Sequence, residues 1–273
     1  MERHGSPSHH SFLSAHILMC LAALVLFTAP SYCQTNDMTR GMNLGDQTRD
    51  TTKSTAREME QMKMGEREME VAHPFFTHMG MPEGVGNYAL RLAGVATTGE
   101  GETEGDFGFH LETGLSETIG LHIRNERVSH NPHTEITFQF AALSSQDRMN
   151  GFSPFMEFEI PTHGGEKTIY TLVGFSTAWA TSGFALNQSL EYSPKEEDVE
   201  GSASAVVKLS ERFFPVVEFI GEAAKGSLPL YTVLGGLKGR ITKHVLIGVA
   251  YEVPVSSEKE FDSRLLVETD LEW

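Results

Sequence analysis

The sequence predicts an all-β protein: a transmembrane antiparallel β-barrel of about twelve strands, preceded by a signal peptide and a Met-rich, partly helical N-terminal arm. Short segments of alternating apolar and polar residues recur from about residue 84 onward. The connections between these segments alternate in length, and aromatic residues fall at the ends of the apolar faces. We therefore expect a signal peptide at 1–33, a flexible Met/His-rich periplasmic arm at 34–83 and an outer-membrane barrel at 84–273.

The first residues have the features of a secretory signal. A polar start contains Arg3, the apolar run "ILMCLAALVLF" covers residues 17–27, and "TAPSYCQ" follows as a cleavage region. The run is about half as long as the roughly 20 residues that a membrane-spanning helix needs. A lipoprotein anchor on Cys33 is the alternative, which Tyr32 disfavours because a small residue is wanted at that position.

Composition narrows the classes of partner and chemistry. Cys20 and Cys33 fall within or at the edge of the expected signal, so the mature chain would have no disulfide and no thiol nucleophile. The formal net charge of −16 argues against nucleic acid as a binding partner and against peripheral binding to anionic lipid. No later apolar run approaches about 20 residues, so a membrane-inserted chain would have to form a barrel.

Between the signal and the barrel, residues 35–71 are polar and contain no aromatic side chain. The first part of this stretch is typical of disorder, and the part from about residue 54 to 71 could form a helix rich in Glu, Met, Lys and Arg.

The barrel strands follow one another along the remaining chain. In "EITFQFA", Ile136 and Phe138 share one face while Thr137 and Gln139 share the other. A soluble β-sandwich would alternate in the same way and remains the competing fold. The expected strands lie near 87–97, 105–113, 117–125, 134–143, 152–161, 167–179, 183–193, 201–210, 213–222, 228–238, 241–253 and 262–273.

The connections favour the membrane barrel over the sandwich. Tight turns are expected near Gly114, 210–212 and 239–240. Transmembrane barrels alternate such short turns with longer outer loops. The longer, charged connections are expected at 98–104, 126–133, 194–200 and 254–261.

Aromatic residues mark two rims. Trp273, as a terminal aromatic residue, resembles the signal by which barrel-assembly machinery recognises its clients. Rings of this kind belong where a barrel meets lipid headgroups. The inner rim is expected to contain Tyr88, Phe152, Trp179, Phe213 and Trp273, and the outer rim Phe107, Tyr192 and Tyr251.

The last 70 or so residues resemble a known group of barrels. "GGLKGRITKHVLIGVAYEVPVSSEKEFDSRLLVETDLEW" has a Gly before the penultimate hairpin, a "VPV" strand exit, an acidic loop and a final aromatic residue. "ERFFPVVEFIGE" is similar to the same group. These features resemble outer-membrane transporters, including those grouped with the phenol-degradation MetA pathway. The resemblance implies an outer-membrane channel or uptake component and supplies no catalytic residue.

The polar parity of the strands predicts the residues that line the lumen. Polar side chains in a lumen can have a structural role, in which they contact water or pair across the barrel. Alternatively, they can make the pore selective for ions of one charge. Carboxylates outnumber bases, so a conducting pore would prefer cations. The predicted lumen residues are His110, Glu112, His122, Arg124, Glu157, Glu159, Glu191, Glu218, His244, Arg264, Glu268 and Asp270.

A second candidate site lies in "HPFFTHMGMPEGVG". Thioether and imidazole ligands suit Cu(I), and His73, His78, Met79 and Met81 are the expected ligands. The alternative is that this stretch docks on the rim of the barrel or plugs it. No nucleophile motif accompanies the lumen histidines, so we do not expect an enzyme or a cofactor beyond this copper site. The expected partners are outer-membrane lipid, the assembly machinery and a small-molecule or metal solute.

Overall fold

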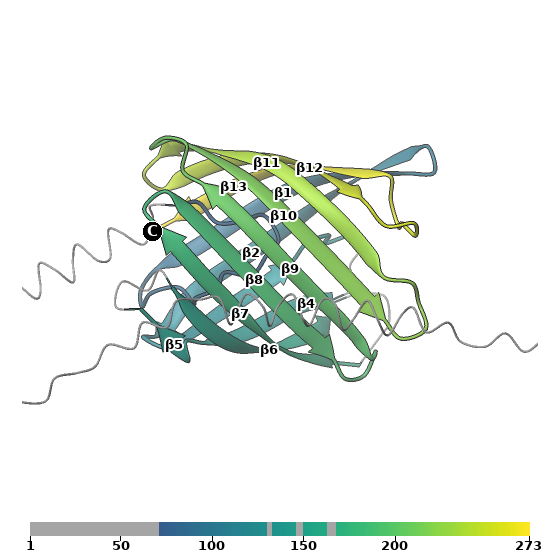
Figure 1. Ribbon diagram of the computed structural model, residues 1–273, viewed down its shortest axis with the longest axis horizontal. Coiled ribbons are helices and arrows are strands. Elements are labelled where there is room, and N and C mark those ends of the chain that lie inside the picture. The colour runs from purple at the N-terminus through teal and green to yellow at the C-terminus, as the bar shows by residue number, and fades with distance from the viewer. Residues whose placement is uncertain (1–70, 130–132, 146–149, 163–167) are drawn as a thin grey trace, which may run out of the picture. The chain divides into compact units, whose positions relative to one another are not determined.

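In the computed structural model, which describes residues 71–129, 133–145, 150–162 and 168–273, the chain forms one antiparallel sheet of thirteen strands (Figure 1). Successive strands pair with each other except β4 and β5; β4 pairs instead with β6, and β13 pairs with β1, so the sheet closes into a barrel. The predicted all-β barrel of twelve strands is confirmed. The extra strand, β5, has two residues and pairs with the start of β6.

The strands are close to the predicted ones. Their bounds are β1 Tyr88–Gly99, β2 Glu102–Ser116, β3 Ile119–Asn125, β4 His133–Phe140, β5 Leu143–Ser144, β6 Gly151–Pro161, β7 Tyr170–Thr181, β8 Phe184–Ser193, β9 Asp198–Val207, β10 Phe213–Ala224, β11 Leu230–Thr242, β12 Val245–Pro254 and β13 Ser263–Glu272. The expected signal peptide and the arm up to residue 70 lie outside the described residues. In the described part of the chain, no helix is long and apolar enough to cross a membrane.

The two faces of the sheet have the reverse of the usual polarity. On β12, Ile247, Val249 and Tyr251 point outward and are 43%, 49% and 53% exposed. On the same strand Glu252 points inward and is 2% exposed. A water-soluble sandwich would bury the apolar face, whereas this barrel exposes it and encloses the charged one. Such an outer surface suits contact with hydrocarbon.

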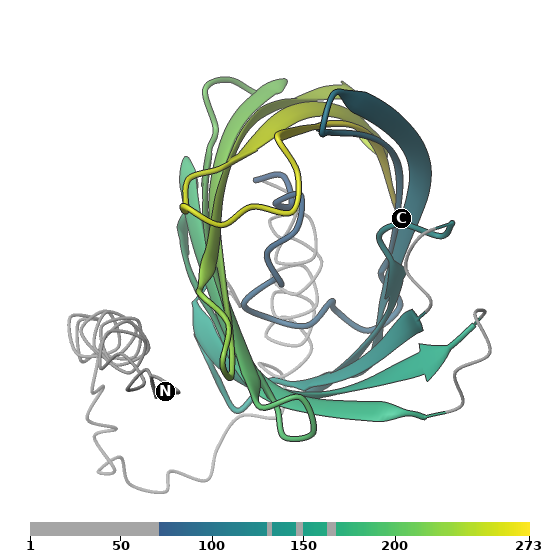
Figure 2. The same cartoon turned by 90° about the vertical axis from the view of Figure 1, so that its right-hand side faces the viewer.

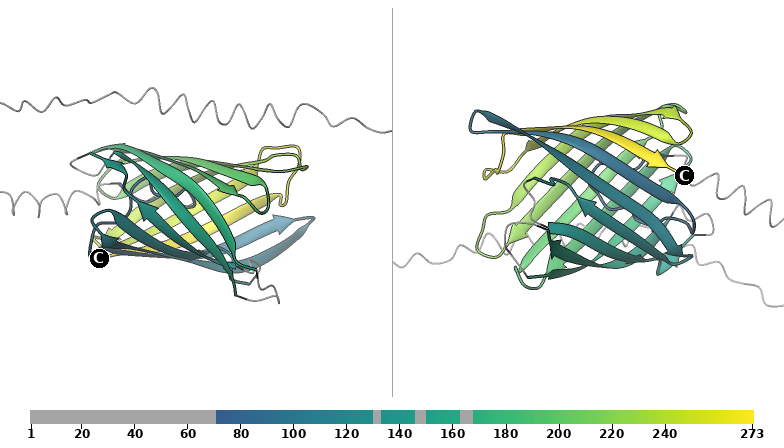
Figure 3. Two further views of the ribbon diagram at one scale, coloured as in Figure 1. Left: turned by 90° about the horizontal axis from the view of Figure 1, so that it is seen from below. Right: turned by 180° about the vertical axis from the view of Figure 1, so that it is seen from behind.

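One expected loop is a tight turn. The connection expected at 98–104 consists of two residues, Glu100 and Gly101, because β1 and β2 extend to Gly99 and Glu102. Glu100 and Gly101 have φ angles of 52° and 86°, the positive values that a two-residue type I′ hairpin needs. The resulting β1–β2 hairpin projects beyond its neighbouring strands (Figures 1 and 3).

A second connection differs in position. The tight turn expected at 239–240 lies at Lys243–His244, because Gly239 and Arg240 still pair with Ile247 and Leu246 in the ladder. Elsewhere the expected alternation of lengths holds only in part. The turns 117–118, 182–183 and 243–244 at the Trp273 end are short, and the connections 126–132 and 255–262 at the opposite end are longer. The long connection expected at 194–200 is only 194–197, because β9 begins at Asp198, and the connections 208–212 and 141–150 at the Trp273 end are longer than it.

The first and last strands meet at an aromatic seam. Tyr88 and Trp273 donate their backbone N–H groups to each other's carbonyl oxygens at 2.8 and 3.0 Å. Their rings stack with centroids 6.3 Å apart, and both side chains are exposed on the outside of the barrel. Trp179 and Phe213 are exposed near the same end of the barrel. The expected inner rim of aromatic rings therefore has a structural counterpart.

The inner face of the barrel carries an apolar cluster beside its charged residues. The cluster includes inward residues on β9 to β13, among them Val206, Phe214, Leu234, Leu246 and Leu266, each at most 1% exposed. These residues are buried because a segment of the chain itself packs against them from inside. The inner surface is therefore filled rather than lined throughout by water-contacting groups.

Candidate functional site

The lumen is occupied by residues 72–82, which we call the plug. This segment precedes β1 and lies within the ring of strands, where it is drawn in blue inside the barrel (Figure 2). Ala72, Phe75, Thr77 and His78 are 1–5% exposed. Thus, of the described part of the expected arm, residues 72–82 lie inside the barrel, as in the alternative in which "HPFFTHMGM" plugs it.

Glu218 on β10 holds the centre of the plug. Its Oε2 accepts hydrogen bonds from the N–H of Phe76 at 3.1 Å, and from the N–H and the Oγ1 hydroxyl of Thr77 at 2.8 Å each. Its Oε1 also accepts from the N–H of Phe75. Three consecutive backbone donors and a hydroxyl therefore converge on one buried carboxylate, which satisfies groups that have no strand partner.

Two cationic side chains of the wall bind one backbone carbonyl oxygen of the plug, that of Pro74. The Nζ of Lys238 on β11 donates to the carbonyl oxygen of Pro74 at 3.2 Å, and the guanidinium of Arg91 on β1 donates to the same oxygen at 3.0 Å. Lys238 also pairs with Glu268 and with Asp270, the latter at 2.9 Å. The plug backbone is thereby included in the ion network of the wall.

The ring of Phe75 lies over two glycines of the wall. A Cβ atom built on Gly236 would be 2.6 Å from the Cε2 of Phe75, and one built on Gly248 would be 2.8 Å from its Cε1. The wall therefore tolerates no side chain at these two positions while the ring is in place. The Nζ of Lys238 lies 4.5 Å from the centre of the same ring, which favours a cation–π contact.

The end of the plug contacts the opposite wall. The amide Nε2 of Gln139 on β4 donates to the carbonyl oxygen of Met79 at 2.7 Å. The N–H of Gly80 donates to Oδ1 of Asn187 on β8 at 3.2 Å. The Sδ of Met81 accepts from the hydroxyl of Ser153 on β6 at 3.6 Å. The plug is thus bonded to strands on both sides of the lumen.

The predicted lumen residues lie as follows. Glu112, His122, Arg124, Glu157, Glu191, Glu218, Glu268 and Asp270 are buried, and His110, Glu159, His244 and Arg264 are half-buried. Several meet a partner of opposite charge, as Arg264 meets Glu252 at 2.9 Å and Arg124 meets Glu135. Pairing across the barrel thus accounts for part of this set.

Five buried charged residues of the described chain lie outside the predicted lumen set. Arg91, Glu135, Lys238, Glu252 and Glu272 are all less than 8% exposed. Arg91 and Lys238 are single charges in otherwise apolar or glycine-rich strands, so they did not form a polar stripe. Parity alone could have found them, because each alternates with outward apolar neighbours such as Leu90 and Leu237.

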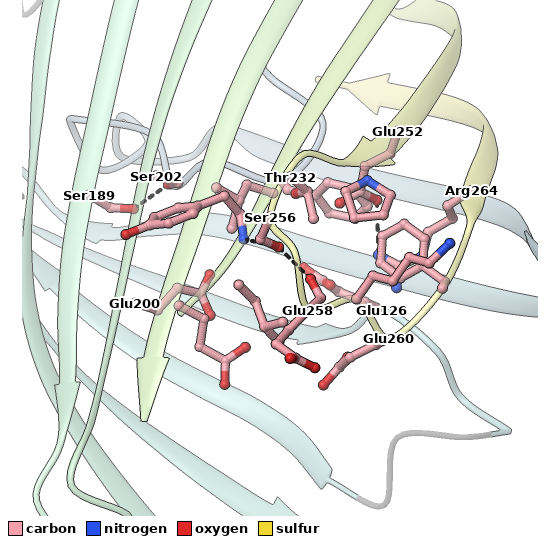
Figure 4. Close-up of a pocket in the computed structure, with 18 of the residues that line it drawn as sticks. Glu126, Ser189, Glu200, Ser202, Thr232, Glu252, Ser256, Glu258, Glu260 and Arg264 are labelled. Atoms are coloured by element: carbon pink, nitrogen blue, oxygen red, sulfur yellow. Dashed lines mark hydrogen bonds and ion pairs between the residues drawn. The ribbon is translucent and has the colours of Figure 1, made fainter. Parts of the chain in front are cut away.

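An open cavity of about 210 Å³ lies above the plug, at the end of the barrel away from Trp273 (Figure 4). The loop 255–262 folds across this opening (Figure 2). In the loop, a hydrogen bond from Lys259 lowers the pKa of the Asp262 carboxyl. The charged lining consists of three cations, Arg124, Lys259 and Arg264, and six glutamates, Glu126, Glu200, Glu222, Glu252, Glu258 and Glu260.

The expected copper ligands belong to different surroundings. The Nε2 of His73 lies 3.4 Å from a carboxylate oxygen of Glu83, and that of His78 lies 3.9 Å from oxygens of both Glu157 and Glu191. His73 and His78 therefore each face carboxylates rather than each other. Met79 contacts Gln139 through its backbone carbonyl oxygen, whereas the sulfur of Met81 accepts from Ser153 and lies over Gly151.

The fold matches that of known channels. No protein-family model matches the chain, and no curated protein is significantly similar to it in sequence. An outer-membrane channel from Pseudomonas putida F1 is similar with a TM-score of 0.52 and 6% identity, over 74% of this chain and 100% of that one. The KdgM porin in complex with a disordered oligogalacturonate has a TM-score of 0.51 and 10% identity, over 67% and 98%. The chain therefore has the β-barrel fold of outer-membrane channels and porins.

Proposed function

We propose that this protein is an outer-membrane channel for small solutes, which prefers cations and whose lumen is closed by the plug in the conformation described here. The reversed polarity of the barrel carries this proposal. An apolar outer surface with exposed aromatic residues near both ends suits lipid, and an enclosed charged interior suits water and ions. The resemblance of the last strands to transporter barrels supports an uptake role.

The acidic cavity supports the cation preference. Carboxylates that surround an entrance raise the local concentration of cations and repel anions. The cavity extends inward to Phe76 and His78 of the plug, so a solute that enters it meets the plug. Permeation therefore requires that the plug shifts or leaves.

Ion selectivity tests the proposal. In planar bilayers with a KCl gradient, the reversal potential of the conducting protein should show cation preference. Changing Glu200→Gln together with Glu222→Gln should move the reversal potential towards that of an unselective pore, because both carboxylates line the cavity.

A matched control removes the same charge elsewhere. Glu117→Gln with Glu211→Gln changes two glutamates on turns at the Trp273 end and should leave the reversal potential nearly unchanged. An anion-selective pore would contradict the cation preference. Absence of conductance in the wild type and in a variant with a weakened plug would contradict the channel itself.

Assembly provides a separate test of location. Deleting Trp273 should lower the yield of folded barrel in outer membranes several-fold, because the stack with Tyr88 and the terminal aromatic residue are lost. Folded barrel is measured by its altered migration on unheated gels. Trp273→Phe should keep most of the yield, and Trp179→Ala, which changes another exposed rim residue, should have the smaller effect. Equal yields for the deletion and for the wild type would refute the assembly role of Trp273.

Copper handling through His73, His78, Met79 and Met81 remains a second prediction. In the described conformation the imidazoles of His73 and His78 face carboxylates, and the sulfur of Met81 accepts a hydrogen bond from Ser153. Cu(I) binding by these three side chains would therefore require them to leave their present contacts. A Cu(I) competition titration with Met79→Ala and Met81→Ala tests this prediction.

A further inference from the structure

His78 of the plug meets two glutamates from different strands. Its Nε2 lies 3.9 Å from Oε2 of Glu157 on β6 and 3.9 Å from Oε2 of Glu191 on β8. One donor atom from each of the three residues lies within 4.8 Å of the other two. All three are at least nine-tenths buried, with exposures of 5%, 1% and 7%. An imidazole and two carboxylates thus converge on one enclosed point.

Two of the converging atoms lack hydrogen bonds. Neither Nε2 of His78 nor Oε2 of Glu191 has a hydrogen-bond partner in the described structure. Buried polar atoms are almost always satisfied, and an ion is one of the usual reasons for an exception. Both atoms point into the same gap, so one bound ion would satisfy both.

The local charge is negative. Arg124, whose charge acts on both carboxylates, forms an ion pair with Glu135 and lies 3.6 Å from Glu126. Its charge is therefore offset before Glu157 and Glu191 are counted. Glu200 adds a further carboxylate, because it is the cross-strand partner of Glu191. A divalent cation would offset two of these buried negative charges.

Neighbouring groups hold the ligands in position. The Oγ1 of Thr137 donates to Oε2 of Glu157 at 2.6 Å and leaves that oxygen a further lone pair. The ring of His78 packs against that of Phe155 with centroids 5.0 Å apart. Phe155 in turn lies over Gly174, where a Cβ atom would be 2.5 Å from its Cζ. Such outer contacts orient metal ligands in proteins.

We propose that His78, Glu157 and Glu191 form a site for a divalent transition-metal ion, which latches the plug to β6 and β8. Nitrogen and carboxylate donors suit Zn²⁺ and similar ions, whereas a Cu(I) site would use the methionine sulfurs. Ligand atoms around Zn²⁺ at about 2.0–2.1 Å lie about 3.3 Å apart. The observed 3.9 Å therefore needs a contraction of roughly half an ångström per contact.

A second group of donors, His110, Glu112 and His122, is the main rival. In that group the guanidinium of Arg91 forms an ion pair with Glu112 and contacts Nδ1 of His110. A cation bound there would lie beside a fixed positive charge, which disfavours it. We therefore assign the ion to the site of His78, Glu157 and Glu191.

Zinc titration of the folded full-length protein in detergent tests the site. Zn²⁺ alone is the probe, in competition with a chromophoric chelator, and migration on unheated gels verifies folding. His78→Gln, Glu157→Gln and Glu191→Gln should each weaken one equivalent of binding by about tenfold or more, because each removes a ligand. His73→Gln, in the same plug, and His110→Gln, in the rival group, should retain that equivalent.

Hydrogen exchange tests separately whether the bound ion fixes the plug to the wall. Zn²⁺ should slow hydrogen exchange at the amides of Phe75, Phe76 and Thr77 in the wild type and have no such effect in Glu191→Gln. Indifference of zinc binding to all three ligand changes, or loss through His110→Gln or through Met79→Ala with Met81→Ala, would overturn the proposal. Binding without slower exchange would overturn the latch. None of these measurements depends on ion conduction, so they stand apart from the test of the channel.

Discussion

Glu218→Gln should release the plug. The change keeps the shape of the side chain but removes the charge that receives three backbone N–H groups and the hydroxyl of Thr77. It also turns one acceptor into an NH₂ group that faces those donors. A buried donor left without its acceptor costs about 1–3 kcal/mol, so the loss of two or more of these contacts amounts to roughly 3–5 kcal/mol. At about 1.4 kcal/mol for each factor of ten, the population with a displaced plug should rise at least a hundredfold.

Hydrogen exchange at residues 75–77 and single-channel conductance both measure this release. Exchange should accelerate, and the conductance of the purified variant should exceed that of the wild type. Glu222→Gln is the matched control, because it removes a carboxylate of the same strand that lines the cavity and is not bonded to the plug. Unchanged exchange in Glu218→Gln would show that the carboxylate does not hold the plug.

Lys238→Met should destabilise the barrel itself. Lys238 is fully buried and pairs with Glu268 and Asp270, so its removal leaves two enclosed carboxylates without their cation. Breaking a buried ion pair by removing one partner costs about 3–5 kcal/mol of the free energy of unfolding. The midpoint of urea unfolding, followed by the shift between folded and unfolded bands on unheated gels, should fall accordingly.

Two further variants make this result specific. Lys238→Met combined with Glu268→Gln should recover part of the loss, because one uncompensated charge is removed with the lysine. Lys259→Met removes a lysine that is exposed and pairs with Asp262 in a loop, and it should change the midpoint little. Equal midpoints for Lys238→Met and the wild type would mean that water or a rearranged Arg91 compensates Glu268 and Asp270.

The strands of this protein could be predicted from the sequence because their period is local. The alternation of Ile247, Val249 and Tyr251 with Gly248 and Glu252 defines both faces of β12 without reference to any other strand. The Glu100–Gly101 turn was missed because the flanking residues "TTGEGETEG" lack the apolar alternation that marks a strand. Those residues pair in the hairpin although their side chains are polar.

The sequence predicted the plug only as an alternative, because the contacts that hold it join residues far apart in the chain. Leu246 faces the inside of a barrel that the polar parity describes as water-filled, and it is buried because Phe75 and its neighbours occupy the interior. Nothing in the sequence around Leu246 reveals a contact with a residue so far away in the chain. Pro74 and Lys238 are also far apart along the sequence, so the residues around Lys238 did not indicate a partner for its charge.

The ion network that surrounds the plug also constrains the order of folding. Pro74 receives Arg91 from the first strand and Lys238 from β11, while Lys238 depends on Glu268 and Asp270 from the last strand. These groups come together only when β13 reaches β1, the pairing with the longest separation along the chain and therefore the slowest kind to form. A nascent barrel without its final strand lacks the acidic half of this network. The plug cannot be fully bound until the seam closes, so its capture reports that the last strand has arrived in register.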